Sequence, residues 1–332
     1  MEDVHVLEYW KSLPPVAWRM AKLVLHACKT DDVSLMVHVI RMAGKDGSEV
    51  TVQEVLQKAL TWAGKKNAMR CLTYILEQGA DVSNLDCIYA YPDFANSPSR
   101  EALELLVAHG WSVNTGALNG EAGIPLLWGV VGDRELVQWC LDHGADVNPP
   151  DHTPPNIMSP RKPLLERAVW SGDIEIFELC RAKGAPMHYG ILPNAVMAAS
   201  LSAVGDSTRF PQQIAMLRHL SDVVKCDVNE ITYGAHYESG SECVNPLCWI
   251  ACHPRPDHTI TEMEELICFL LDKGGDVDMT MEHKGFSKDD DVVIQSARES
   301  AKERHNYLFS RIVDEWEAKH RSKAPKNLPI AK

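Results

Sequence analysis

A ten-residue segment at 139–148, which ends in Gly-Ala-Asp-Val-Asn, recurs in related form along most of the chain. Each copy has a run of apolar residues, then a glycine, and then a similar turn sequence. The landmark glycines are Gly79, Gly110, Gly144, Gly184 and Gly274, and a further copy at 224–229 has lost its glycine. Repetition of this kind predicts a stack of similar modules, each of which contacts only its neighbours.

Each copy is typical of two short helices. Pro246 exemplifies the proline that opens the first helix, where the missing N–H costs little. Gly172 separates the first helix from the second, and the landmark glycine ends the second helix with a positive φ. The second helix carries a one-sided apolar stripe, as in Leu136, Val137, Cys140 and Leu141. One such pair cannot bury its own stripe, so the pairs must stack.

Two further segments carry a resemblance to a known family. Residues 245–251, Asn-Pro-Leu-Cys-Trp-Ile-Ala, and 124–128, Ile-Pro-Leu-Leu-Trp, are similar to the Thr-Pro-Leu-His-x-Ala opening of an ankyrin repeat. Residues 132–137 and 172–176 are similar to the Gly-His-x-Glu-Val-Val of the same repeat. The chain therefore resembles the ankyrin repeat family. The resemblance implies an all-α fold, an α-solenoid of about eight helix pairs with short finger loops.

The spacing of the landmarks sets the expected domain organisation. Successive landmarks lie 31 residues apart near the N-terminus and 49 near the C-terminus, and we assign the excess to loops. We expect a lead-in at 1–15, an array at 16–318 with degenerate caps at both ends, and a basic tail at 319–332. The final helix pair is expected from Asp291 to His320. The predicted loop insertions are 149–161, 205–211, 230–245 and 254–261.

The cysteines and the N-terminus indicate the compartment. The chain has ten cysteines, and the first residues are acidic with no apolar signal segment behind them. Most cysteines fall inside apolar helical patterns, as expected for free thiols in a reducing compartment. The apolar stretch at 16–28 is interrupted by charged residues, so no membrane-spanning helix is expected. We expect an intracellular protein, cytoplasmic or nuclear, with no membrane partner.

The charge balance restricts the partners. Thirty-three Lys and Arg stand against 46 Asp and Glu, a net charge of −13, which repels phosphate backbones and argues against nucleic acid. An acidic body favours a protein partner with a basic or mixed surface. The basic tail is interpreted as solubilising rather than as an import signal.

No motif for nucleotide, serine-nucleophile or zinc-protease chemistry is present, so we expect no cofactor and name no catalytic residue. Cys243, Cys248, Cys252 and His253 are spaced so that they suggest a zinc site. The repeat pattern places Cys248 and Cys252 in a helix core, and we favour packing cysteines and no metal.

Aromatic and histidine side chains mark the candidate binding surface. Trp62, Trp128, Trp170 and Trp249 recur late in the first helix of their copies. Helix packing and partner anchoring are both open for Trp128 and Trp170, whereas Trp62 and Trp249 are expected to be half-buried. Histidines and tyrosines of two finger loops would face the same groove. The candidate partner-binding residues are Trp128, Trp170, His188, Tyr189, Tyr233, His236, Tyr237, Trp249 and His253.

By its resemblance to the ankyrin family, the chain is expected to be a protein–protein interaction module that acts as a scaffold rather than an enzyme. The long loops and the His, Tyr and Trp content also resemble irregular, stand-alone fungal ankyrin proteins. The alternative is therefore a small-molecule-binding or cryptically catalytic accessory protein of a natural-product pathway. A closed pocket roofed by 205–211 and 233–241 would favour a small molecule, and an open groove would favour a protein.

Overall fold

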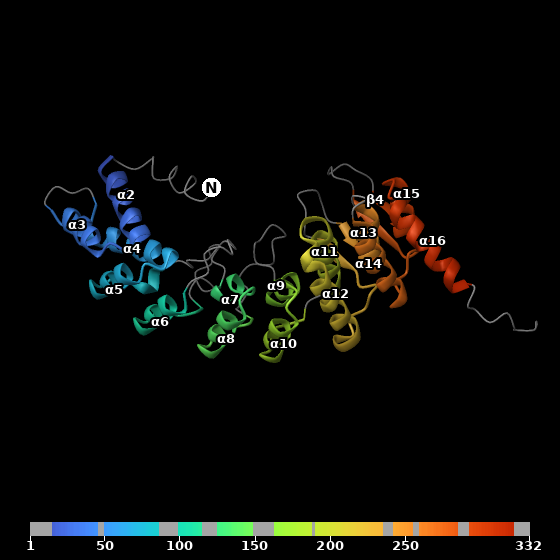
Figure 1. Ribbon diagram of the computed structural model, residues 1–332, viewed down its shortest axis with the longest axis horizontal. Helices are drawn as coiled ribbons and strands as arrows, with labels where there is room; N and C mark the ends of the chain where they lie inside the picture. Colours follow the sequence, from blue (N-terminus) through green and yellow to red (C-terminus); the bar gives the residue numbers. More distant parts are fainter. Residues whose placement is uncertain are drawn as a thin grey trace, which may run out of the picture. The chain divides into compact units, whose positions relative to one another are not determined.

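The computed structural model describes residues 15–45, 50–85, 99–114, 125–148, 163–187, 190–234, 242–254, 259–284 and 292–321. Its contacts divide the chain into two compact units, Met1–His152 (unit 1) and Thr153–Lys332 (unit 2). Figure 1 labels the helices and strands of both units. Whether the chain forms the single array of 16–318 stays a prediction.

Helices of unit 1 contact one another in pairs, α2 with α3, α4 with α5, and α7 with α8. The first pair also packs on the second, because α2 and α4 lie side by side (Figure 1). The elements are α2 (Pro15–Thr30), α3 (Val33–Ala43), α4 (Val52–Lys66), α5 (Met69–Glu77), η1 (Val82–Asn84), α6 (Arg100–Ala108), α7 (Leu126–Gly129) and α8 (Arg134–Asp142).

Unit 2 contains further helix pairs and two short β-hairpins. The helices are α9 (Leu164–Ser171), α10 (Ile174–Ala182), α11 (Ile191–Gly205), η3 (Ser207–Arg209), α12 (Phe210–His219), η4 (Leu220–Val224), α13 (Pro246–Cys252), α14 (Ile260–Asp272), α15 (Ala297–Glu303) and α16 (Tyr307–Arg321). The strands are β1 (Thr232–Gly234), β2 (Glu242–Val244), β3 (Thr280–Lys284) and β4 (Val292–Ser296), and β1 pairs with β2 and β3 with β4, both antiparallel. The predicted all-α class with paired helices is confirmed for the bulk of the described residues.

The same helix-ending turn closes the second helix of each recognisable copy. Gly184 adopts a φ of +94°, its N–H donates to Arg181, and the N–H of Ala185 donates to Cys180. These two bonds satisfy carbonyls that would otherwise lack a partner at the helix end. The predicted positive φ is confirmed at all five landmark glycines: Gly79, Gly110, Gly144, Gly184 and Gly274.

The copy without a glycine keeps the turn through a local adjustment. Lys225 takes the left-handed conformation instead, with a φ of +68°. The helix before it widens into one π turn, η4, so that the N–H of Cys226 reaches Leu220, one residue further back than in the other copies. A π turn absorbs one inserted residue without ending the helix. Lys225 is therefore structurally equivalent to the landmark glycines of the other copies.

Side chains from one turn bind the backbone of the next. Asn114 donates to the carbonyl oxygen of Gly144 at 2.9 Å and accepts from the N–H of Asp146 at 2.8 Å. Asn229 makes the same pair of bonds with Gly274 and Asp276, at 3.0 and 2.8 Å. The recurrence shows that successive turns within a unit are held in the same relative position.

Four boundary predictions differ from the structure. The final helix pair begins at Ala297 rather than Asp291, because residues 292–296 pair with β3 as a strand. The supposed loop at 205–211 is the end of α11, the 3-10 turn η3 and the start of α12, and the supposed loop at 254–261 ends inside α14. Helix α16 continues to Arg321, so the tail does not begin at 319.

Helix α11 forms the centre of unit 2. It contacts α9, α12, α13 and α14, and its residues from Ile191 to Ser200 are all buried. A helix that is buried on every side needs apolar residues on every side, which explains why it shows no amphipathic stripe. Among the described helices, none has the length and apolar character needed to cross a membrane.

Candidate interaction surface

A chain of hydrogen bonds links Trp170, at the end of α9, to two turns of unit 2. The indole N–H of Trp170 donates to Oδ1 of Asn194 at 3.2 Å, and Nδ2 of Asn194 donates to the carbonyl oxygen of Gly190 at 2.9 Å. The N–H of Gly190 in turn donates to Oε1 of Glu230 at 2.8 Å. Trp170 is half-buried and Asn194 is buried. The bonds therefore connect the indole of a partly accessible tryptophan, through Asn194 and Gly190, to Glu230.

Glu230 places a carboxylate at the N-terminus of α11. Gly190 and Leu192 both offer backbone N–H groups to it, at a helix end where negative charge is favoured. Burial nevertheless raises the pKa of Glu230 above its usual range, and the two backbone bonds offset only part of this effect. Ionisation of Glu230 is thus less favourable in the folded protein than in water, because the buried carboxylate has lost part of its hydration.

The pH dependence of stability should reveal this cost. In wild-type protein, the folded state holds the Glu230 proton more tightly than the unfolded state, so stability should fall as pH rises from about 4.5 through the raised pKa. Glu230→Gln keeps a neutral acceptor, so the variant should gain stability relative to wild type across that window. Urea unfolding at a series of pH values measures the difference. If the stability of the variant relative to wild type decreases with rising pH, the pKa of Glu230 is not raised in the folded protein.

The other repeated tryptophans are mostly covered. Trp128 is 7% exposed and Trp249 is 5% exposed, whereas Trp62 is half-buried as expected. Trp128 therefore serves helix packing in this structure, and Trp249 is more deeply buried than the sequence indicates. Of the two residues left open between packing and anchoring, Trp170 alone keeps a substantial accessible surface.

His253 lies directly on Trp249. Their rings stack with centroids 4.3 Å apart and an interplanar angle of 19°, and Nδ1 of His253 is 2.7 Å from the carbonyl oxygen of Trp249. The same Trp-x-x-x-His stack occurs at 139–143 and 316–320. The stack places His253 over the end of α13, where a histidine satisfies a terminal carbonyl.

The cysteines of the zinc alternative do not gather with other ligands in the described residues. Cys248 is buried, with its Sγ 3.9 Å from Oγ of Ser300, and Cys252 is half-buried. The side chain of Cys243 lies outside the described part. Within the described ranges, no group of three or more His, Cys, Asp or Glu side chains could hold a metal ion.

Four of the predicted site residues lie outside the described residues: His188, Tyr189, His236 and Tyr237. Tyr233 is placed in β1, and its side chain lies outside them as well. Gly190, directly after residues 188–189, and Glu230, two residues before β1, nevertheless share the hydrogen bond given above. The structure thus brings the roots of both predicted fingers together with Trp170.

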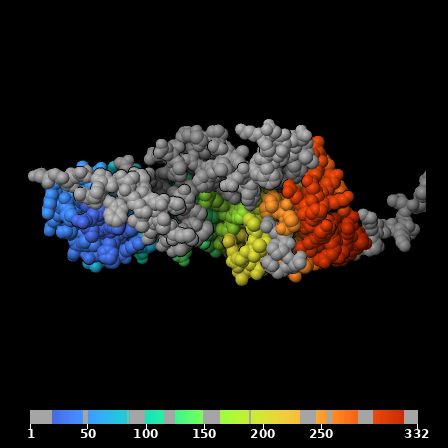
Figure 2. Space-filling view, turned by 90° about the horizontal axis from the view of Figure 1, so that it is seen from above, coloured from blue at the N-terminus to red at the C-terminus, as the bar shows by residue number. Residues whose placement is uncertain are grey.

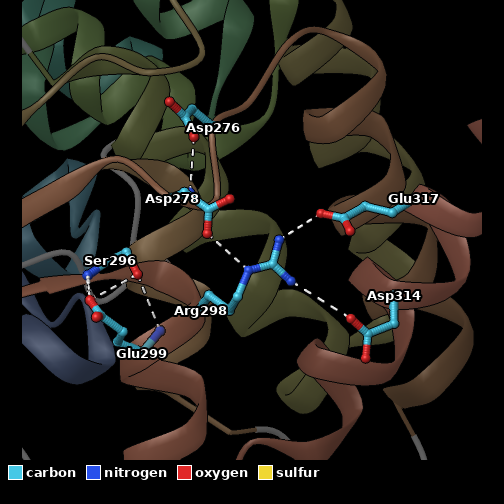
Figure 3. Close-up of polar contacts among 7 residues, drawn as sticks. All are labelled: Asp276, Asp278, Ser296, Arg298, Glu299, Asp314 and Glu317. Carbon is cyan, nitrogen blue, oxygen red and sulfur yellow. Dashed lines mark hydrogen bonds and ion pairs between the residues drawn. The ribbon is translucent and has the colours of Figure 1, made fainter. Parts of the chain in front are cut away.

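An ion cluster around Arg298 ties the last helix pair to the preceding turn (Figure 3). The guanidinium of Arg298, on α15, lies 2.9 Å from Asp278, 2.6 Å from Glu317 and 3.6 Å from Asp314. The hydrogen bond to Asp278, with that to Glu317, raises the pKa of Arg298 above its usual range. Figure 2 shows this end of unit 2 in red and orange. The cluster is a structural tether, and sequence analysis did not detect it.

Asn194 and Glu230 were also missed. Asn194 stands alone among Ile, Leu, Pro, Ala, Val and Met in α11, and a polar residue inside an apolar run is the signal that could have indicated it. Glu230 carries no comparable signal, because its partner lies 40 residues away in the sequence.

Comparison with known proteins gives a partial match. No family model matches the chain. A segment of 111 residues, 32% of the chain, is 36% identical to an ankyrin repeat domain-containing protein, SAT10, of Stachybotrys chartarum (strain CBS 109288 / IBT 7711). The match spans 6% of that protein's length. The chain is thus a helical protein with distant similarity to an ankyrin repeat protein.

Proposed function

We propose that the chain is an ankyrin-type array of about eight helix pairs that acts as a protein-interaction module. The recurring helix-ending turn and the repeated asparagine bonds between turns support this architecture. The partial identity to SAT10 supports it independently. Repeats of this kind leave the side chains of first helices and turns free for recognition, since stability comes from contacts between neighbours.

The observation that carries the proposal is the anchored position of Trp170. Its indole is fixed by Asn194 at the base of two turns, yet the side chain remains half-accessible. A rigid aromatic with one satisfied polar atom loses little entropy on binding and is the residue type that dominates binding hot spots. We propose that Trp170 is the main contact for the partner. Residues 188–189, residues 233–237 and His253 are the further contacts that we propose.

The test is capture of the partner from native lysate, its identification, and titration of the purified pair. Trp170→Ala is expected to weaken affinity roughly ten- to thirty-fold, as for a hot-spot tryptophan. Tyr307→Ala is the matched control, since Tyr307 is 74% exposed on α16 and should leave affinity unchanged. Equal effects of the two substitutions, with both variants folded by circular dichroism, would contradict the role of Trp170.

The net charge supports a partner with a basic or mixed surface, whose association rate should fall as salt rises. Mass measurement of the intact captured complex also addresses the alternative of a small-molecule role. A retained metabolite without a protein partner would replace the interaction module by that alternative.

A further inference from the structure

The first helix of each of the first two pairs inverts the charge of the chain. Helices α2 and α4 together carry six Lys or Arg and a single acid, Glu54. That is a charge of +5, whereas the whole chain carries −13, so the remainder carries −18. Oε2 of the one acid, Glu54, accepts from the N–H and hydroxyl of Thr51 at 2.7 and 2.8 Å, and the positive charge of Lys58 also acts on this carboxylate.

The basic side chains of α2, one histidine included, share one face. Arg19, Lys22, His26 and Lys29 are all exposed and follow one another at intervals of three or four residues. This spacing places them on a single side of the helix. The opposite side is formed by the buried residues Met20, Val24, Ala27 and Cys28. The dark blue atoms of α2 lie at the surface of unit 1 in Figure 2.

Helix α4 also carries basic side chains on the side away from its buried residues. Lys58 and Lys65 lie two turns apart with Trp62 between them, and the Nζ atom of Lys65 is 6.0 Å from the centroid of the Trp62 ring. The opposite side of α4 is buried, and Ala59 on it accepts a weak hydrogen bond from Sγ of Cys28 on α2. We call Arg19, Lys22, Lys29, Lys58, Trp62 and Lys65 the basic face.

Helix formation alone does not account for the basic face. Cations in the last turn of a helix are favoured by the helix dipole, which explains Lys29 and Lys65. Arg19 and Lys22 lie further from the helix ends, and like charges three residues apart destabilise a helix. Lys58 follows Glu54 by four residues, a spacing at which opposite charges stabilise a helix. A half-buried tryptophan among the cations adds an apolar contact that a purely solubilising surface would not need.

We propose that the basic face binds an acidic segment of a protein partner. Lys22 and Lys29, like Lys58 and Lys65, are seven residues apart, which is about 10 Å along a helix. A peptide in the polyproline II conformation rises about 3.1 Å per residue with three residues per turn, so every third side chain lies on the same side, about 9 Å apart. The fitting ligand is therefore a peptide in this conformation with a carboxylate at every third residue and an apolar side chain that contacts Trp62.

This inference rests on the proposed function but concerns a second surface, in unit 1. A partner of mixed charge satisfies both, with an acidic segment on the basic face and neutral or basic parts elsewhere. A nucleic acid is disfavoured as the occupant, because the rest of the chain repels a long polyanion.

The probe is a short fluorescein-labelled peptide with glutamate at every third position and a central leucine, titrated against the full chain by anisotropy. A glutamine version of the peptide is the ligand control. Wild-type protein is expected to bind the glutamate peptide at least tenfold more tightly than the glutamine peptide, with an affinity that falls as salt rises.

The variant is Lys58→Glu with Lys65→Glu, and it should lose at least tenfold in affinity for the glutamate peptide. Lys58→Gln with Lys65→Gln is the milder version and should lose part of that affinity. Arg41→Glu with Lys45→Glu is the matched control, because both residues are exposed, Arg41 on α3 and Lys45 just after it, and the charge change is the same. Circular dichroism and unfolding midpoints show that the variants fold.

Equal binding of the two peptides, or equal loss in the matched control, would overturn the inference. So would tighter binding of oligothymidylate or of phosphatidylserine vesicles than of the glutamate peptide, since each would assign the face to another polyanion. Partner capture that depends on Trp170, with no binding of the glutamate peptide, would remove this inference and leave the proposed function standing.

Discussion

Replacing Asn306 by leucine is expected to destabilise unit 2 by about 2–4 kcal/mol. Asn306 is 5% exposed and joins two helices of different pairs. Its Nδ2 donates to the carbonyl oxygens of Ile250 and Ala251 at 3.0 and 3.2 Å, and its Oδ1 accepts from the N–H of Phe309 at 3.2 Å. Leucine fills a similar volume but leaves the last carbonyls of α13 and the first N–H groups of α16 without these partners.

Hydrogen exchange of the α13 and α16 amides, together with urea unfolding, measures the loss. Asn306→Ser is the matched control, because a serine hydroxyl can still accept from Phe309 and cap α16 but does not reach both carbonyls. We expect the serine variant to recover about 1 kcal/mol. If the leucine variant loses less than about 1 kcal/mol, Asn306 is not the link between the two pairs.

Replacing Gly275 by alanine is expected to destabilise the protein by about 1–3 kcal/mol. Gly275 follows the landmark Gly274, a place that Ala80, Ala145 and Ala185 take in other copies. A Cβ at 275 would lie 2.8 Å from Cδ1 of Leu247 and 2.9 Å from the carbonyl oxygen of Leu270. That carbonyl also accepts the N–H of Gly275 at 2.9 Å, so it cannot move without weakening the turn.

Gly205→Ala is the matched control for this substitution. Gly205 ends α11 with nothing within 4 Å of a new Cβ. Alanine there should be neutral or stabilise by up to about 1 kcal/mol, because it lowers the entropy of the unfolded chain. Thermal and urea unfolding compare the two variants. A Gly275→Ala protein at least as stable as wild type would show that Leu247 relaxes and that the clash is not real.

Gly275 also illustrates how far the sequence could predict the fold. The positive φ at Gly79, Gly184 and Gly274 follows from local geometry, because a left-handed helix stop needs only one permissive residue and a short turn. Lys225 could be aligned with these positions for the same reason. The close approach of Leu247 to Gly275 involves a residue 28 positions away, and no local pattern records it.

The strand at 292–296 shows the limit of periodicity. Val292, Val293 and Ile294 begin a segment that we assigned to an amphipathic helix, yet it pairs with β3. A short apolar run is compatible with either structure, and the partner strand decides between them. The helix start that the sequence does encode lies later, at Ser296 and Glu299, whose side chains form a reciprocal cap.

The candidate interaction surface could also be predicted only in part from the sequence. Tryptophans at equivalent sequence positions marked the right helices, but Trp128 and Trp249 are covered by neighbours whereas Trp170 and Trp62 are not. The exposure of a side chain depends on which segments pack over it, and its own position in the repeat does not determine that. Asn194 and Glu230 anchor the surface through partners 24 and 40 residues away.

The sequence by itself determined the repeated unit, the places where its helices stop and the apolar face that each pair must bury. These properties depend on residues within one or two turns of each other, where backbone preference and spacing suffice. Tertiary structure alone decided which tryptophan stays accessible and which buried polar groups find partners. Those outcomes depend on segments that meet only after the helix pairs have stacked.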